Sequence, residues 1–235
     1  MMYLMKLGSH KGQVDVLIGI IVFGSIWGFL EATLGGLFHF IHFPYKGAIM
    51  GGIAISIMAT FITMQKRNPG YVICLGFIAA LFKPLDALIL GAPLFAPFVI
   101  NPAIAILSET LAFSLVASLL FKGSQSTIKL RVLVGGLAGY LSIAFYGIVA
   151  SFIGLGSWAG TGFYERVSYA LVNGTGVAVV GAILLPLGWI GGSYLHPQLL
   201  LFRETSPRLF YTSTATVSTL CWLIAGFTFA QGALP

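Results

Sequence analysis

Four ionisable side chains interrupt the apolar segments of this chain, namely Glu31, Lys83, Asp86 and Glu109. A charged side chain at the centre of a lipid bilayer costs roughly 2.5–3.5 kcal/mol on insertion scales. Only 8% of the residues are charged, so charges inside apolar segments indicate a specific use. One ammonium and three carboxyl groups are suited to binding a small polar molecule or to carrying a proton.

Two interpretations of these four residues fit the sequence. In the first they form a structural ion-pair network, in which Lys83 and Asp86 pair at i, i+3 on one helix face. In the second they form a polar site that binds a ligand. Because carboxyl groups outnumber the ammonium, either one or two of them hold a proton in the dehydrated site, or a cationic or strongly hydrogen-bonding ligand completes it.

Two further residues are candidates for this site, Trp27 and Asn101. Trp27 lies one helical turn before Glu31 on the same face, where its ring can stack on a ligand or pack against a neighbouring helix. Asn101 precedes Pro102, a combination that favours a helix N-terminus with Asn101 as the N-cap. Pro84 is expected to disturb its helix and to free backbone carbonyl groups for a ligand.

The composition predicts the elements that must hold these residues. The chain has 235 residues, of which 58% are hydrophobic, and its mean hydropathy is +0.99. A soluble domain carries about 25% charged residues, far more than this chain. We therefore expect an all-α, polytopic transmembrane helical bundle, because a helix satisfies its own backbone in lipid. The predicted helices, each close to the ~20 residues that cross a bilayer, span 14–40, 46–64, 71–91, 102–121, 132–153, 167–190 and 212–230.

We expect a single integral membrane domain over residues 1–235, with a six-helix core at about 14–195 and an extra C-terminal helix at about 212–230. Basic residues gather in alternate connections, and cytoplasmic connections are enriched in Lys and Arg. The predicted N-terminus is therefore cytoplasmic, and the four ionisable residues share one level, from the middle to the outer half of the membrane. The basic residues of the predicted cytoplasmic side are Lys6, Lys11, Lys66, Arg67, Lys122, Lys129, Arg131, Arg203 and Arg208.

Several function classes find no support in the sequence. The net charge of +6 comes from short basic connections and does not indicate nucleic-acid binding. There is no P-loop and no HExxH zinc motif, so we expect no ATP hydrolysis by the chain, no cofactor and no enzymatic activity. Cys74 and Cys221 form no disulfide framework. His39 and His42 have a spacing that can bind metal, but interfacial histidines are the simpler interpretation.

Four stretches of the sequence carry a resemblance to a known group of proteins. They are 27–35 (WGFLEATLG), 43–47 (FPYKG), Lys83-Pro84 and 101–109 (NPAIAILSE). Together they resemble uncharacterised membrane proteins grouped with the substrate-binding S components of energy-coupling factor (ECF) vitamin transporters, over roughly residues 14–195. Such proteins have six helices, so the seventh predicted helix departs from the pattern.

The resemblance implies a protein of the plasma membrane that captures a vitamin or its precursor from the external face. It implies partners as well, a transmembrane T component and a pair of ATPases. Small residues on the first helix of such proteins face the T component, a role that the resemblance gives to Gly24 and Gly28.

The expected function is therefore that of the substrate-binding membrane subunit of an ECF-type importer, which captures a small vitamin-like molecule at the outer polar site. The first alternative is a stand-alone, proton-coupled secondary transporter, in which Glu31 or Glu109 carries the proton. A membrane-embedded enzyme and a structural subunit of a larger complex are further alternatives. These two alternatives can be told apart from transport. A purified enzyme would turn over its substrate without partner proteins, and a structural subunit would bind no ligand.

Overall fold

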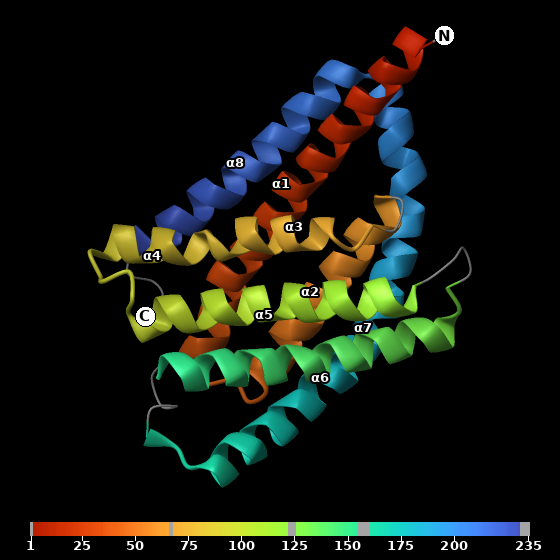
Figure 1. Cartoon of the computed structure of the whole chain (residues 1–235). Coiled ribbons are helices and arrows are strands. Elements are labelled where there is room, and N and C mark those ends of the chain that lie inside the picture. The colour runs from red at the N-terminus through yellow and green to blue at the C-terminus, as the bar shows by residue number, and fades with distance from the viewer. Residues whose placement is uncertain (1, 66–67, 122–125, 155–159, 231–235) are drawn as a thin grey trace.

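The structure is a computed structural model, and it describes residues 2–65, 68–121, 126–154 and 160–230. All of its regular elements are α-helices (Figure 1). They are α1 (Met2–Phe40), α2 (Lys46–Met64), α3 (Tyr71–Ala80), α4 (Phe82–Leu90), α5 (Pro97–Leu120), α6 (Ile128–Ile153), α7 (Phe163–Thr205) and α8 (Pro207–Ala230). In the described residues, seven helical segments are long and apolar enough to cross a membrane, and α3 and α4 together form one of them. The predicted seven-span helical bundle is confirmed, and the chain is a multi-pass membrane protein.

Most helix bounds lie within five residues of the prediction, and three of the differences bear on the site or on the length of a helix. α1 begins at Met2, so the basic N-terminal segment is itself helical. α5 begins at Pro97 rather than Pro102, because Ala96 is extended and a proline in the first turn is preorganised for a helix. α7 continues to Thr205 rather than to about residue 190. At 1.5 Å per residue α7 is about 65 Å long, roughly twice the thickness of the hydrocarbon core.

The third membrane span is broken at Leu81, between α3 and α4. Pro84 has no N–H group and cannot donate to the carbonyl of Ala80, the residue at which α3 ends. The ring of a helical proline also clashes with that carbonyl. The predicted disturbance at Pro84 is therefore confirmed, and it leaves Lys83 in the first turn of a separate helix.

Glycines bring the backbones of α2, α6 and α7 into direct contact. A Cβ atom at Gly188 would lie 2.2 Å from the carbonyl oxygen of Ser56 on α2, and one at Gly135 on α6 would lie 2.3 Å from the carbonyl oxygen of Gly181. The Thr60 hydroxyl donates to the Gly188 carbonyl at 2.9 Å. Lipid provides no hydrophobic drive for helix association, so such close packing is what holds membrane helices together.

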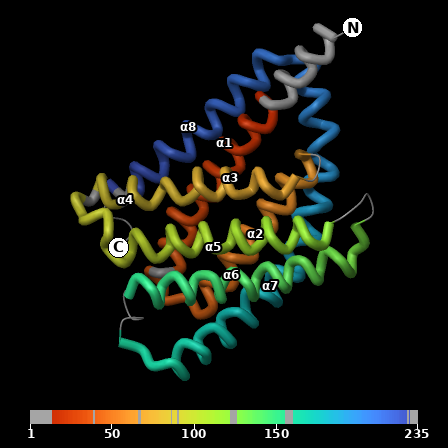
Figure 2. Tube along the Cα trace, in the orientation of Figure 1, coloured from red at the N-terminus to blue at the C-terminus, as the bar shows by residue number. Residues whose placement is uncertain are grey.

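The C-terminal helix α8 is part of the bundle and lies along α1 (Figures 1 and 2). The indole of Trp222 donates to the Ser25 hydroxyl on α1 at 3.1 Å. The same indole lies against the ring of Phe82 on α4, with 3.9 Å between the ring centroids. α8 therefore covers the seam where α1 meets α4, next to Lys83.

The helix ends that carry basic residues lie on one side of the bundle. In Figure 1 the start of α1, the ends of α2 and α5 and the junction of α7 with α8 gather toward the right. The end of α4, the start of α5 and the start of α7 lie toward the left. On the predicted orientation, the right side of this view is cytoplasmic and the left side is external.

The contact between α2 and α7 predicts different effects for two neighbouring glycines of α7. Gly188→Ala places a Cβ 2.2 Å from a backbone oxygen, so we expect a loss of roughly 1–3 kcal/mol, as in other overpacked cores. Gly191→Ala is the matched control, because the nearest atom to its Cβ would be 4.0 Å away. Thermal unfolding in mild detergent should show a lower midpoint for Gly188→Ala alone. Equal midpoints for the two variants would contradict this packing.

Candidate functional site

Three of the predicted site residues come together from three helices. Lys83 on α4 is buried, with 7% of its surface exposed, and its ammonium donates to the backbone carbonyl of Glu31 on α1 at 3.3 Å. The Glu31 carboxyl lies close enough to Lys83, and also to Glu109 on α5, for their charges to interact. The sequence prediction that these residues share one level is consistent with this arrangement.

Two glycines leave room for the carboxyl groups. A Cβ at Gly35 would lie 3.4 Å from Glu31 Oε2, and one at Gly51 would lie 3.1 Å from Glu109 Oε1. Gly35 is one helical turn beyond Glu31 on α1, and Gly51 belongs to α2. The site therefore lies among α1, α2, α4 and α5, and a side chain at Gly51 would crowd Glu109, whereas a Cβ at Gly35 would make ordinary van der Waals contact with Glu31.

Three buried polar side-chain atoms have no hydrogen-bond partner, and two of them, on Trp27 and Glu109, lie at this site. They are Trp27 Nε1, Asn101 Oδ1 and Glu109 Oε2, and they are the only such side-chain atoms in the part of the chain that the structure describes. An unsatisfied buried polar atom costs about 1–3 kcal/mol, and in native proteins each one calls for an explanation such as a ligand or a water. All three belong to residues that the sequence singled out as candidates.

Asn101 lies inside α5, and its predicted role as an N-cap is wrong. The helix starts earlier, at Pro97, so the backbone around Asn101 is already helical. Asn101 and Glu109 are spaced i, i+8, which puts them on one face of α5. The alternative reading of Asn101, as a residue that contacts a ligand, therefore gains a geometric basis.

Trp27 is fully buried, with 0% of its surface exposed. Its indole lies near the Glu31 carboxyl, as the spacing of one helical turn predicts, but outside hydrogen-bond geometry. The indole N–H is thus a donor at the edge of the site that makes no well-aligned hydrogen bond, with the Glu31 carboxyl as its nearest acceptor.

The side chain of Asp86 lies outside the described residues, as does that of His39, although the backbones of both are helical. The predicted pairing of Lys83 with Asp86 stays a prediction. In the described residues, no group of three or more His, Cys, Asp or Glu side chains could hold a metal ion.

Gly24 and Gly28 were predicted to face a partner protein, and the structure gives them contacts within the chain instead. A Cβ at Gly24 would lie 2.7 Å from Ile78 Cβ, and one at Gly28 would lie 2.2 Å from the ring of Phe82. Both glycines are buried, because this face of α1 is covered by α3 and α4. The GxxxG spacing indicates close helix packing, but the spacing alone cannot tell an internal neighbour from an external one.

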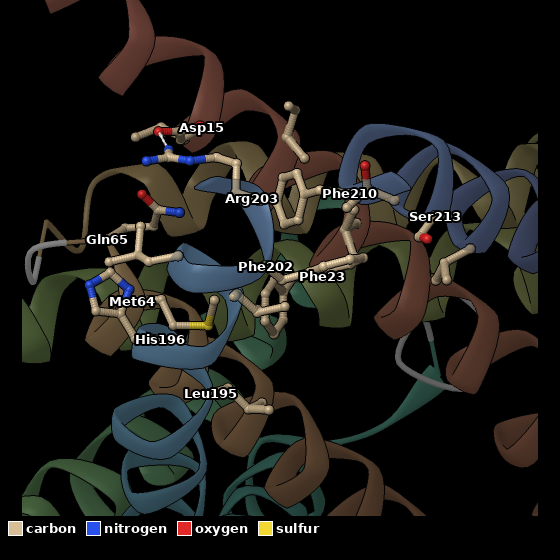
Figure 3. Close-up of a pocket in the computed structure, with 18 of the residues that line it drawn as sticks. Asp15, Phe23, Met64, Gln65, Leu195, His196, Phe202, Arg203, Phe210 and Ser213 are labelled. Atoms are coloured by element: carbon tan, nitrogen blue, oxygen red, sulfur yellow. Dashed lines mark hydrogen bonds and ion pairs between the residues drawn. The ribbon is translucent and has the colours of Figure 1, made fainter. Parts of the chain in front are cut away.

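A separate cavity of about 1060 Å³ lies at the other end of α1 (Figure 3). Its lining includes the ion pair between Asp15 and Arg203, together with His196 and Gln65. The sequence predicts only that Arg203 lies on the cytoplasmic side, and it does not indicate a site here, because each of these residues stands alone beside an apolar segment. Asp15 is the residue that could have indicated this site from the sequence. It is an acid at the start of the first span, on the predicted side where basic residues prevail.

The contact between α1 and α4 predicts energetic coupling of Lys83 with Glu31. We expect Lys83→Met and Glu31→Gln to be non-additive by roughly 0.5–3 kcal/mol, the range for residues in contact. Equilibrium unfolding of the two single variants and the double variant in mixed micelles measures this term. Asp15→Asn is the control, since 16 helical residues separate it from Glu31, about 24 Å, and it should combine additively with Lys83→Met. Additivity of both pairs would show that the charges of Lys83 and Glu31 do not interact.

Comparison with known proteins adds no relative. A scan of family models, a search of curated proteins and a search of solved structures each found no match for this chain. The chemistry of the site therefore rests on the residues of this chain and their geometry.

Proposed function

We propose that the chain is the substrate-binding membrane subunit of an importer of the ECF type, which captures a small vitamin-like molecule from the external face. The observation that carries the proposal is the pair of buried, unpartnered polar atoms beside the Lys83–Glu31 contact, Trp27 Nε1 and Glu109 Oε2, with a third on Asn101 about 12 Å farther along α5. A purely structural ion-pair network would satisfy its own polar atoms, since unsatisfied ones are costly in a medium without water. A bound ligand would supply the missing partners.

The unpartnered atoms support a particular class of substrate. Asn101 Oδ1 and the Glu109 carboxyl accept hydrogen bonds, whereas the Trp27 indole donates one. Glu31 lies near both Lys83 and Glu109, so one acid of the pair holds a proton or a cationic, donor-rich ligand balances the charge. A small nitrogen heterocycle with an amino group has donors, an acceptor and a ring in one molecule, and it matches this set.

The external side has features that suit capture. The helix break at Leu81 and Pro84 frees the carbonyl of Ala80 within the span. The connection from α4 to α5 exposes apolar side chains, with Phe95 81% exposed. A loop of this kind can close over a ligand. The chain has no nucleotide motif, so delivery to the cytoplasm would be driven by partner ATPases through a T component, on a surface other than the buried one at Gly24 and Gly28.

The first test of this proposal is capture of a small molecule. Glu109→Gln and Lys83→Met should each abolish retention of the ligand while insertion and yield stay close to wild type. The chain is purified from native membranes in mild detergent, and mass spectrometry identifies the small molecules and proteins that accompany it. Glu204→Gln makes the same change at an exposed position on α7 and should retain the ligand. If Glu109→Gln and Lys83→Met fail to accumulate, the residues are structural and the proposal loses its main support.

A second candidate function is a stand-alone, proton-coupled carrier. The observation that favours it is the approach of two carboxyl groups, Glu31 and Glu109, close enough for their charges to interact. Like charges held together favour a proton on one of them, and intramembrane acids of this kind carry protons in many transporters. Such a carrier would need no ATPase and no T component.

Energy dependence separates the two candidates. For an ECF-type subunit, uptake into cells that express this chain should stop on ATP depletion and should persist when the proton gradient alone is collapsed. A proton-coupled carrier should give the reverse pattern, and Glu109→Gln should then remove the dependence on the gradient. Uptake by the purified chain in vesicles without ATP would contradict the importer proposal and support the carrier.

A further inference from the structure

The cavity at the cytoplasmic end of the predicted orientation has a long apolar wall. It lies between the first half of α1, the end of α2, the last part of α7 and the first half of α8 (Figure 3). Phe23, Leu199, Phe202, Phe210 and Val217 are among its apolar lining residues. Its volume, about 1060 Å³, is at the top of the range of roughly 300–1,000 Å³ for small-molecule sites. A long apolar group is suited to pack against such a wall.

Polar side chains gather at one end of the same cavity. Figure 3 shows Asp15 and Arg203 joined by an ion pair, with Gln65 and His196 on the same side and the phenylalanines on the other. The two members of the pair come from α1 and α7 and remain partly exposed, at 28% for Asp15 and 24% for Arg203. The cavity is therefore amphipathic, with a charged end that a ligand can reach.

The position of the cavity matches the level of a lipid headgroup. Large apolar side chains on the same helices are exposed beside it, including Leu17 at 56%, Leu201 at 63% and Leu209 at 62%. Exposed apolar surface of this kind faces lipid in a membrane protein. The charged end of the cavity coincides with the beginning of the first span at Val14, where hydrocarbon gives way to headgroups.

Arg203 is the cation that lines the cavity, and the sequence adjoining the cavity-lining segments is mainly basic. The chain segments that lead into it contain the basic residues Lys6, Lys11, Lys66, Arg67, Arg203 and Arg208. The acidic residues in the same segments are Asp15 and Glu204. Basic pockets between membrane helices on the cytoplasmic side are suited to anionic lipid headgroups.

We propose that this cavity binds one anionic phospholipid of the cytoplasmic leaflet, with the phosphate at Arg203 and an acyl chain along the apolar wall between α1, α7 and α8. Binding exchanges the Arg203–Asp15 pair for an Arg–phosphate pair, which two parallel N–H···O bonds make strong and specific. The carboxyl of Asp15 competes with the phosphate for the same guanidinium. A soluble metabolite would leave the apolar wall without a partner, so the membrane is the source of the ligand. This site is independent of the outer polar site and of the function proposed for it.

Because Asp15 and the phosphate compete for Arg203, substitutions at Asp15 and at Arg203 should change lipid affinity in opposite directions. The delipidated chain in detergent is titrated with phosphatidylglycerol and, separately, with phosphatidylcholine, and native mass spectrometry counts the lipids bound per chain. Wild type should bind one phosphatidylglycerol in preference to phosphatidylcholine. Asp15→Asn frees Arg203 and should tighten phosphatidylglycerol binding about fivefold, whereas Arg203→Gln should weaken it by a similar factor.

Two further variants complete the test. Leu199→Trp fills the cavity and should remove binding of both lipids, with thermal unfolding used to show that the variant is folded. Lys129→Gln removes a positive charge from an exposed position on α6, on the same side but outside the cavity, and should leave binding unchanged. Phosphatidylglycerol binding that moves in the same direction in Asp15→Asn and Arg203→Gln, or that survives in folded Leu199→Trp, would overturn the proposal. So would a wild-type chain that retains no lipid.

Discussion

The structure depends on one contact that is buried away from water, between the Lys83 ammonium and the Glu31 carbonyl. A lysine at this depth has to find its partners within the protein, since hydrocarbon supplies none. The helix break at Pro84 separates α4 from α3 and gives Lys83 its own approach to α1. Gly28 admits the ring of Phe82 against α1, and Trp222 of α8 stacks on the outer side of that ring. A proline, a glycine and two aromatic residues thus serve the placement of one charge.

The helices around this contact pack closely, but polar atoms of the site between them lack hydrogen-bond partners. At Gly135 and Gly188 the helices touch backbone to backbone, so α2, α6 and α7 form a unit in which little can shift. Near the Lys83–Glu31 contact, by contrast, Trp27 and Glu109 each keep a buried polar atom without a well-aligned partner. Proteins tolerate such costs where function requires them. The contrast between a closely packed frame and an incomplete polar interior is typical of a binding site.

The sequence predicted the class, the seven spans and most helix ends, because apolar length and charge determine these directly. It also predicted the break at Pro84, whose missing N–H acts locally. The start of α5 was misplaced because Asn101-Pro102 has the local signature of a helix start, while Pro97 offers the same signature one turn earlier. Glycine spacing indicated close packing at Gly24 and Gly28 but not its partner, since spacing contains no information on what lies across the interface. The end of α7 was predicted about 15 residues too early, because a segment of the length that crosses a bilayer ends near residue 190, yet the helix continues through Pro197 to Thr205.

α1 connects the two polar regions of the molecule and also keeps them apart. Its outer part presents Glu31, and its inner part presents Asp15 and Phe23 to the cavity. Between them lie the fully buried side chains of Trp27 and of Phe61 on α2, and the half-buried Phe23 ring at the edge of the cavity meets Phe61 edge-on at 5.9 Å. A substrate that passes from the outer site to the cytoplasm along α1 would have to part these side chains. The α2–α7 contact is made by backbone atoms and the α1–α2 contact by side chains, so α1 can separate from α2 at lower cost than α7 can. Because a Cβ at Gly24 would lie 2.8 Å from the Leu75 carbonyl oxygen, a displacement of α1 in either proposed mechanism would take α3 with it.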